Sequence, residues 1–339
     1  MKNKTSSQQL GPKIQKMPIL QEVLGEIGRA NQEAEKLKAQ IVLKNNVLLP
    51  ILESQPDPKK ERRVIVYIAK VGSPKSTISP DDIAPIGSML SAIGKVKNLD
   101  LILHSPGGNG VVAEKIVHMC RQHCTDFFRV IVPNMAKSAA TLIALGADAI
   151  VMGYFSELGP IDPQKIINVG GRPQQISAQA FLDARKILLE DIQKAKSQRQ
   201  DITGYLQQLT SSSMDPAFIV ECQREIDFAK DFVRQHLPKH MLKHKFPKLK
   251  LTKRKDKAGI IAENLVSTDK RFVHGRMIDP RECRSIDLNV LELPQEDPYW
   301  EKILEFYVRA EVFMMAQSKP NQPPASKLFA DANSYLLAY

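Results

Sequence analysis

The sequence predicts an α/β fold with a mostly parallel sheet and flanking helices. From Arg63 onward, short apolar runs rich in β-branched residues alternate with segments that have the patterning and start signals of helices. The first run, residues 64–69, lacks polar alternation, which is typical of a strand buried on both faces. Strands separated by helices are joined by right-handed crossovers into a parallel sheet. The 339 residues allow one large domain with extensions or two smaller domains.

A helical arm is expected over residues 1–60. After a polar start, apolar residues recur at helical spacing from Pro18 to about Leu52. Pro56 and Pro58 end this helix, because proline lacks an amide proton and biases the preceding residue to extended backbone.

The core is expected over residues 61–290, and its elements follow in order. Ser79 can cap a helix whose first position is Pro80. Further strands are predicted at residues 99–104, 128–132 and 149–152. Helices are predicted at residues 111–122, 138–145, 178–197, 215–242 and 258–265.

A helix and a tail are expected at the C-terminus, over residues 291–339. The helix covers residues 299–317. The tail after Lys319 contains Pro320, Pro323 and Pro324, and we expect it to be mobile or to dock a partner.

Composition favours a folded protein that stays out of the membrane. Apolar residues make up 43% of the chain and charged residues 25%, as in ordinary globular proteins. No run approaches the roughly 18 uninterrupted apolar residues of a membrane span. The polar N-terminus lacks the apolar stretch of a secretory signal, so we expect the cytoplasm.

The cysteines indicate neither a disulfide framework nor a paired zinc motif. The chain has four of them, Cys120, Cys124, Cys222 and Cys283, and we expect buried free thiols. Cys120 and Cys124 can share one helix face, which leaves a metal or redox pair as the alternative. We expect no metal and no cofactor.

Two segments that follow predicted strands carry the chemistry. Open α/β sheets place ligands at the carboxyl ends of their strands. The first segment, Ser105-Pro106-Gly107-Gly108, is a turn whose glycines let amide groups approach a ligand closely. Taken alone, it is better explained as a simple turn. The second places Ser138 among small residues where a helix begins, beside free amides and the positive end of the dipole. Taken alone, Ser138 is better explained as an N-cap.

Together the two segments predict acyl-transfer chemistry, because the turn can donate one amide to an oxyanion and the residue after the serine another. At this point the chain resembles the ClpP/crotonase superfamily, and within it the signal peptide peptidase SppA and serine dehydrogenase proteinase branch. The resemblance rests on three segments, residues 104–108, 136–141 and 156–164. It implies Ser138 as nucleophile with Gly107 and Ala139 as oxyanion hole. Ala140 departs from the glycine that is usual in relatives.

The general base is the least determined part of this prediction. In the Clp proteolytic subunit a histidine follows the serine by about 25 residues, whereas residues 159–163 contain none here, which disfavours a Ser-His-Asp triad. SppA-like enzymes use a lysine about 40 to 50 residues after the serine, and a neutral lysine can accept its proton. Lys186 lies in that window. Lys165 and His274 are the alternatives. Lys186 also fits an ordinary solvated helix face.

A basic segment, residues 239–257, accounts for much of the net charge of +11. It is dense enough to bind phosphates, but it lacks interleaved aromatic residues for base stacking, with Phe246 alone inside it. We therefore expect a solvated or oligomer-contact surface, with nucleic-acid binding the less favoured alternative.

The leading hypothesis is a serine peptidase that hydrolyses peptide bonds through an acyl-enzyme on Ser138, with a lysine base and no need for ATP. The resemblance implies a homo-oligomer that acts on peptides or proteins. One alternative is a crotonase-like acyl-CoA enzyme, which needs no serine at the helix start. Another is a non-catalytic assembly or nucleic-acid-binding protein.

Overall fold

The structure is a computed structural model that describes residues 62–169, 171–209, 215–266, 275–316, 325–332 and 334–339. The predicted arm, residues 1–60, lies outside the described residues, and so does His274.

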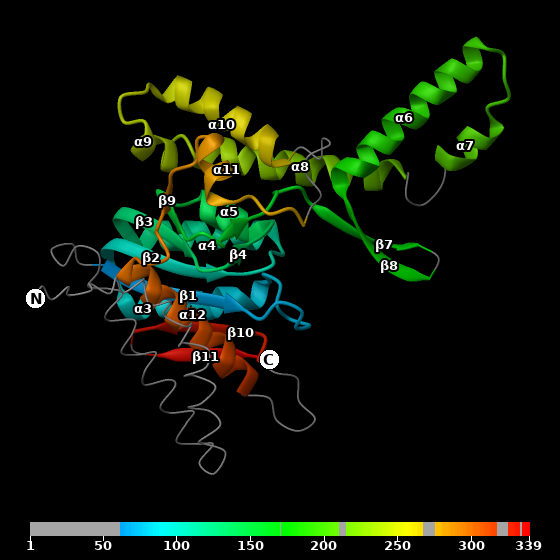
Figure 1. The fold of residues 1–339 in the computed structure, drawn as a ribbon. Coiled ribbons are helices and arrows are strands. Elements are labelled where there is room, and N and C mark those ends of the chain that lie inside the picture. The colour runs from blue at the N-terminus through cyan, green and yellow to red at the C-terminus, as the bar shows by residue number, and fades with distance from the viewer. Residues whose placement is uncertain (1–61, 170, 210–214, 267–274, 317–324, 333) are drawn as a thin grey trace, which may run out of the picture.

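A seven-stranded sheet forms the centre of the molecule (Figure 1), in the order β11-β10-β1-β2-β3-β5-β9. The run from β1 to β9 is parallel throughout. Its strands are β1 (Arg62–Ala69), β2 (Val96–His104), β3 (Cys124–Val132), β5 (Ala149–Met152) and β9 (Val290–Glu292). The predicted α/β fold with a mostly parallel sheet and flanking helices is confirmed.

Helices pack against one face of this sheet around the larger apolar core. Side chains of alternate strand residues, such as Leu101 and Val130, point into this core. The helices are α3 (Ile83–Ile93), which follows a 3-10 turn (Pro80–Asp82), and then α4 (Gly110–His123), α5 (Ala139–Leu145), α8 (Pro216–His236), α10 (Leu251–Val266) and α11 (Pro280–Ser285).

One predicted helix is divided in two. We expected a single helix over residues 215–242, but α8 ends at His236 and a short helix, α9 (Met241–Lys245), follows. Pro238 lies between them and cannot continue the hydrogen-bond ladder of α8. The next helix, α10, begins at Leu251, earlier than residue 258, where we expected it.

The opposite face of the sheet is covered by α12 (Pro298–Ala316). Here Ile102, Ile131 and Val151 from three neighbouring strands meet Trp300 and Phe306 of the helix. Strand β1 is apolar on both faces because both are covered, as its unbroken apolar run indicated.

The C-terminal tail is part of the sheet, which corrects the expectation of a mobile or docking end. Strand β10 (Lys327–Asp331) pairs antiparallel with β1, and β11 (Tyr335–Ala338) pairs with β10. All residues of β10 are buried. Lys327 Nζ lies 2.6 Å from Asp82 Oδ1 in a buried ion pair that ties β10 to the start of α3. The proline-rich stretch just before it, residues 317–324, lies outside the described residues.

A hairpin and two helices project from the body of the molecule (Figure 1). The hairpin consists of β7 (Gln164–Val169) and β8 (Arg172–Ser177). It leads into α6 (Ala178–Ser197), which has the predicted bounds, and α7 (Thr203–Leu209).

In the part of the chain that the structure describes, no helix is long and apolar enough to cross a membrane. Cys120, Cys222 and Cys283 are buried and unpaired, and Cys124 is half buried.

Candidate active site

Two loops meet at the carboxyl end of the sheet because they follow neighbouring parallel strands. The turn 105–108 follows β2, and the nucleophile loop, residues 133–138, follows β3. Ser105 N–H donates to Met135 O at 3.1 Å, and Lys137 N–H donates to Ser105 O at 3.1 Å. These bonds place the Gly107-Gly108 pair beside Ser138.

Ser138 stands at the N-terminus of α5 in a strained backbone conformation. Its φ is 51° and its ψ is −118°, in the region that non-glycine residues rarely adopt. Its side chain makes no capping hydrogen bond, so the N-cap interpretation does not describe this serine. The hydroxyl is left available at the positive end of a short helix.

Gly107 packs directly on the serine. Its φ of +103° is one that L side chains rarely adopt. Its N–H donates to Ser105 Oγ at 3.1 Å, so in this structure that amide already has an acceptor. Gly107 O accepts from Ile78 N–H, and Asn109 N–H donates to Ile78 O, which leaves Gly108 N–H between them without a partner among the described residues. Ala139 N–H is the first amide of α5, and such amides lack an intrahelical acceptor.

The third motif, residues 156–164, holds the nucleophile loop from the other side. The strands β4 (Met135–Ala136) and β6 (Glu157–Leu158) pair in parallel. Thr141 Oγ1 lies 2.7 Å from Ala136 O and 2.9 Å from Gly159 O. Lys137 Nζ pairs with Glu157 at 2.9 Å, and its aliphatic chain lies against Gly159. Hydrogen bonds and an ion pair thus join the residues around Ser138 to the third motif.

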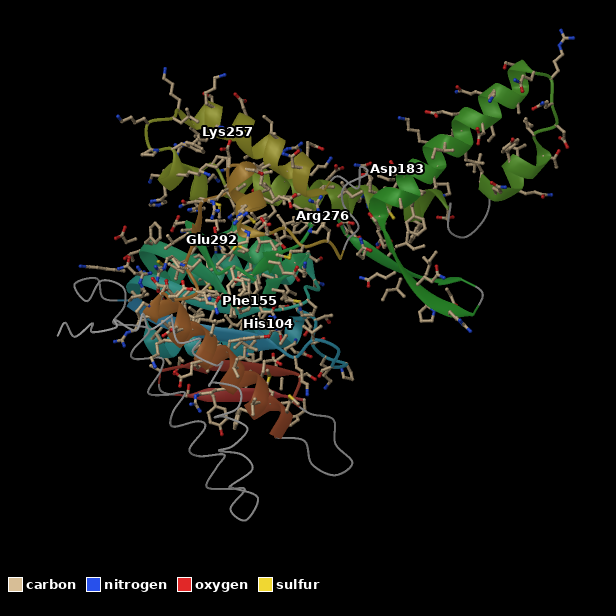
Figure 2. The ribbon with its side chains drawn as sticks, in the orientation of Figure 1. His104, Phe155, Asp183, Lys257, Arg276 and Glu292 are labelled. Atoms are coloured by element: carbon tan, nitrogen blue, oxygen red, sulfur yellow. The ribbon has the colours of Figure 1, made fainter. Side chains whose placement is uncertain are left out.

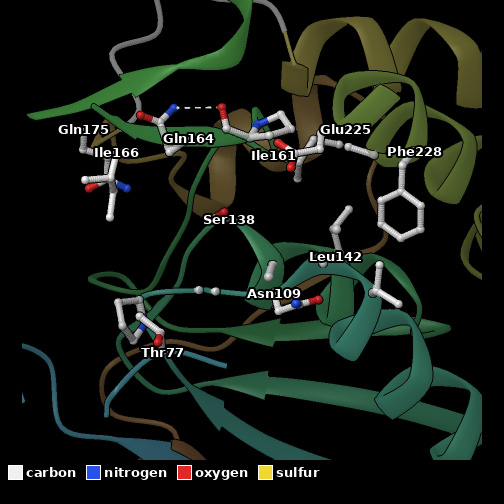
Figure 3. A pocket seen from close by; sticks show the side chains of 18 of the residues that line it. Thr77, Asn109, Ser138, Leu142, Ile161, Gln164, Ile166, Gln175, Glu225 and Phe228 are labelled. Atoms are coloured by element: carbon white, nitrogen blue, oxygen red, sulfur yellow. Dashed lines mark hydrogen bonds between the residues drawn. The ribbon is translucent and has the colours of Figure 1, made fainter. Parts of the chain in front are cut away.

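Ser138 lines a cavity of about 540 Å³ (Figure 3). On one side of the serine lie apolar side chains, among them Leu142 and Phe228. On the other side lie residues of the hairpin, Gln164, Ile166 and Gln175. The predicted Gly107 and Ala139 line the same cavity.

The structure separates the candidates for the general base. Lys186 is exposed on α6 and is not among the residues that line the cavity. Lys165 lies between two residues of the cavity wall, and its ammonium pairs with Glu221 and Glu225, each at 2.8 Å. Burial lowers the pKa of Lys165, but the hydrogen bonds and charges of the two carboxylates outweigh it and raise the pKa overall. His274 lies outside the described residues.

Sequence reasoning missed the wall that α8 contributes. Glu221, Arg224, Glu225 and Phe228 project from one face of this helix into the cavity. Their spacing of three and four residues signals a shared face, but it does not reveal that the face looks at Ser138.

The basic segment lies on α9 and the first turns of α10. Two of its lysines bind groups within the same molecule. Lys245 Nζ donates to Leu288 O at 2.9 Å, and Lys257 pairs with Asp287. Both ammonium groups also lie over the ring of Phe246.

Comparison with known proteins agrees with the three motifs. Residues 76–210 match the model of the ClpP-like SDH-type serine proteinases. The expected family resemblance is confirmed over this segment. The segment includes the turn, Ser138 and the hairpin, so the family match covers most of the cavity described above.

Two uncharacterized proteins of Methanocaldococcus jannaschii are similar to parts of the chain. MJ0137 is 44% identical over 87 residues, which are 26% of this chain and 30% of that protein. MJ1495 is 34% identical over 110 residues, which are 30% of this chain and 36% of that protein. The chain therefore spans about a third of the length of the curated relatives it matches.

Two solved structures of the 1510-N membrane-bound stomatin-specific protease were also matched. A serine-to-alanine mutant has a TM-score of 0.38 at 14% identity and covers 67% of this chain and 79% of that chain. A lysine-to-alanine mutant with a substrate peptide has a TM-score of 0.28 at 13% identity and covers 67% of this chain and 90% of that chain.

Proposed function

We propose that this protein is a serine peptidase that hydrolyses peptide bonds through an acyl-enzyme on Ser138, with a lysine as general base and without ATP. One observation carries the proposal. Ser138 is held at positive φ at the start of α5, its side chain makes no capping bond, and it lines a cavity beside Gly107. The match of residues 76–210 to a serine proteinase family supports the same chemistry.

In the proposed reaction the Ser138 hydroxyl oxygen attacks the carbonyl carbon of the peptide while the lysine accepts its proton. Ala139 N–H and an amide of the Gly107-Gly108 pair donate to the resulting oxyanion. The C–N bond then breaks, and the lysine returns the proton to the leaving amine. Water hydrolyses the ester and releases the free serine. If Gly107 N–H is the second donor, its bond to Ser105 Oγ must open, whereas Gly108 N–H needs no such change.

The lysine is proposed from the family resemblance, with Lys186 first and Lys165 as the alternative. For Lys165 to act, it must leave Glu221 and Glu225, because these carboxylates favour its charged form. For Lys186 to act, α6 must reach Ser138 of another copy of the chain, or the cavity must change shape so that Lys186 reaches Ser138 of the same chain. A homo-oligomer allows the first of these. The family resemblance is what supports such an assembly.

A serine-reactive fluorophosphonate probe and a peptide library tested without nucleotide address this proposal. We expect the probe to label Ser138, and Ser138→Ala to abolish both labelling and hydrolysis. Ser177→Ala is the matched control, because Ser177 is also the N-cap serine of a helix but its side chain does cap, accepting from Gln179 N–H at 3.2 Å. This variant should lose about 1 kcal/mol of stability and keep its activity. Full hydrolysis by Ser138→Ala would overturn the proposal.

A further inference from the structure

A polar cluster lies behind the candidate active site, between β2 and α12. His104 is the last residue of β2 and directly precedes the turn 105–108. Because side chains alternate along a strand, His104 shares with Asp100 and Ile102 the face that α12 covers. It is 2% exposed. His104 lies within the body of the molecule, whereas Asp183 lies on the projecting α6 (Figure 2).

The His104 ring contacts the nucleophile loop and α12, and its backbone leads directly into the turn 105–108. Met135 N–H donates to His104 Nδ1 at 3.3 Å, which joins the ring to the nucleophile loop. On its other side, Nε2 lies 3.4 Å from Tyr307 Oη and 3.9 Å from Glu311 Oε1. The rings of His104 and Tyr307 pack edge to face with centroids 5.0 Å apart.

Tyr307 also contacts the nucleophile loop directly. Asn134 Nδ2 donates to Tyr307 Oη at 3.0 Å. One phenol oxygen of α12 therefore contacts the residue before the turn 105–108 and a residue of the loop that carries Ser138. A change in either contact shifts one loop relative to the other, because protein interiors are close-packed and transmit displacement.

We propose that His104 and Tyr307 are positioning residues that align the oxyanion turn with the nucleophile loop from the opposite side of the sheet. The role in catalysis rests on the proposed peptidase function. It goes beyond that function because it assigns to the C-terminal helix a part in the reaction, at residues that touch neither substrate nor the reacting atoms. Tyr307 is connected to Ser138 through its contact with Asn134 and then along the backbone of the nucleophile loop, past Met135.

The protonation state of the ring suits this role. Burial lowers the pKa of His104 to about 4. The ring is therefore neutral near pH 7, and its Nδ1 lone pair is free to accept the Met135 proton. That assigns the ring proton to Nε2, which faces Tyr307 and Glu311. Burial raises the pKa of Glu311, and Lys70 opposes that shift, so the surroundings disfavour a charged pair with the ring.

A comparison of two tyrosines of the same helix tests the proposal. Tyr307→Phe removes the oxygen that joins the loops. Tyr299→Phe is the matched control, because Tyr299 also places its oxygen on the sheet, where it accepts from Arg129 Nη2 at 3.2 Å, but contacts neither loop. We expect Tyr307→Phe to slow fluorophosphonate labelling of Ser138 about tenfold, while Tyr299→Phe leaves the rate unchanged.

A pair of substitutions at His104 tests the acceptor. Asn places Oδ1 where His104 has Nδ1, so His104→Asn should keep the bond from Met135 and lose less than about tenfold in labelling rate. His104→Leu has a similar size without the acceptor, and we expect a loss of about 100-fold. A merely structural role would lower stability in both variants without this rescue by Asn.

Hydrogen exchange measured on residues 104–108 and 133–138 separates this proposal from the proposed function. We expect Tyr307→Phe and His104→Leu to speed exchange in both segments, and Tyr299→Phe to leave them unchanged. If wild-type Ser138 is not labelled at all, the peptidase proposal fails and exchange still decides the positioning role. Equal exchange and equal labelling in the two tyrosine variants would overturn the inference.

Discussion

Gly107 lies against Ser138 with no room for a side chain between them. A β-carbon on Gly107 would lie 2.7 Å from Ser138 Cβ and 2.6 Å from the carbonyl oxygen of Lys137. The second of these contacts is with backbone, which cannot turn away as a flexible side chain can. The glycine is thus required by the position of the serine as well as by its own φ of +103°.

Gly107→Ala is expected to displace the nucleophile loop. We predict a fall of about 100-fold in fluorophosphonate labelling of Ser138, because a displacement of about 1 Å has an effect of this size. The free energy of unfolding should fall by about 2 kcal/mol, from steric overlap and an unfavourable φ. Labelling kinetics and urea unfolding measure the two effects.

Gly72→Ala separates overlap from backbone strain. Gly72 also has a positive φ, +87°, but nothing lies within 4 Å of the position of an added β-carbon. This variant should lose about 1 to 2 kcal/mol of stability and keep the wild-type labelling rate. If the two alanine variants are labelled equally fast, the contact of Gly107 with Ser138 has no part in reactivity.

Single substitutions are expected to identify which lysine acts as the general base. Lys186→Met and Lys165→Met remove the two candidates. The one that acts as base should lose at least about 100-fold in kcat with little change in KM, because proton transfer contributes about 10² to 10⁴ in rate. Peptide hydrolysis across pH measures this. Wild-type kcat in both variants would exclude both lysines as the base.

Lys165→Met also has a predicted effect on stability that depends on pH. The folded-state pKa of Lys165 is raised above its ordinary value, so its ion pairs stabilise the fold below that value and cease to do so as the pH rises through the raised pKa. Wild type should therefore melt at a higher temperature than Lys165→Met at pH 7, with the difference vanishing in strong alkali. The partners Glu221 and Glu225 are 61% and 41% exposed, so the effect should be small and weakened by salt. A difference that grows with pH would contradict this assignment.

The pattern of apolar residues in the sequence predicted most strands of the sheet. It also predicted that the turn 105–108 and the nucleophile loop meet. The apolar runs of β1, β2, β3 and β5 are short, rich in β-branched residues and separated by helices, which indicates parallel strands. The loops that follow neighbouring parallel strands must meet at one edge. For this reason the strand pattern alone predicts that Ser138 and Gly107 lie together. The strained φ of Ser138 could not be predicted, because the residues around Ser138 pack against residues 156–159, and this long-range packing has no local signal in the sequence.

Long-range packing accounts for what the sequence did not predict. The C-terminal prolines indicated a mobile or docking tail, yet β10 pairs with β1, and its Lys327 forms a buried ion pair with Asp82, far away in the chain. In the same way, the Tyr307 contact with His104 depends on how α12 crosses the sheet. Neither pairing leaves a periodic signal in the sequence.

Cysteine reactivity is expected to follow burial. Burial raises the pKa of both Cys120 and Cys283 to about 12, so little thiolate is present at pH 8. Cys124 is half buried, and its pKa is also raised, chiefly by burial. Iodoacetamide should modify Cys124 slowly in the folded protein and leave Cys120 and Cys283 unmodified until urea unfolds it. Mass spectrometry of the peptides measures this, and rapid native alkylation of Cys120 would contradict the described packing.

The buried pair of Lys327 and Asp82 is expected to anchor the C-terminal strands. The two side chains are 3% and 2% exposed, and Tyr67 Oη also donates to Asp82 at 3.0 Å. Lys327→Met leaves the carboxylate buried without its cation, and we predict a loss of about 3 to 5 kcal/mol in the free energy of unfolding. Adding Asp82→Asn should recover part of this loss, because the carboxylate that lacks its cation is then replaced by a neutral amide. Urea unfolding of the single and double variants measures the coupling.

An exposed lysine provides the control for this last prediction. Lys302 pairs with Glu305 within α12 at 3.0 Å, and its side chain is 44% exposed. Because water screens that pair, Lys302→Met should lose no more than about 0.5 kcal/mol. If Lys327→Met is no more destabilising than Lys302→Met, then strand β10 does not depend on its buried charge pair, and apolar contacts such as that of Phe329 with Tyr67 hold the C-terminus in the sheet.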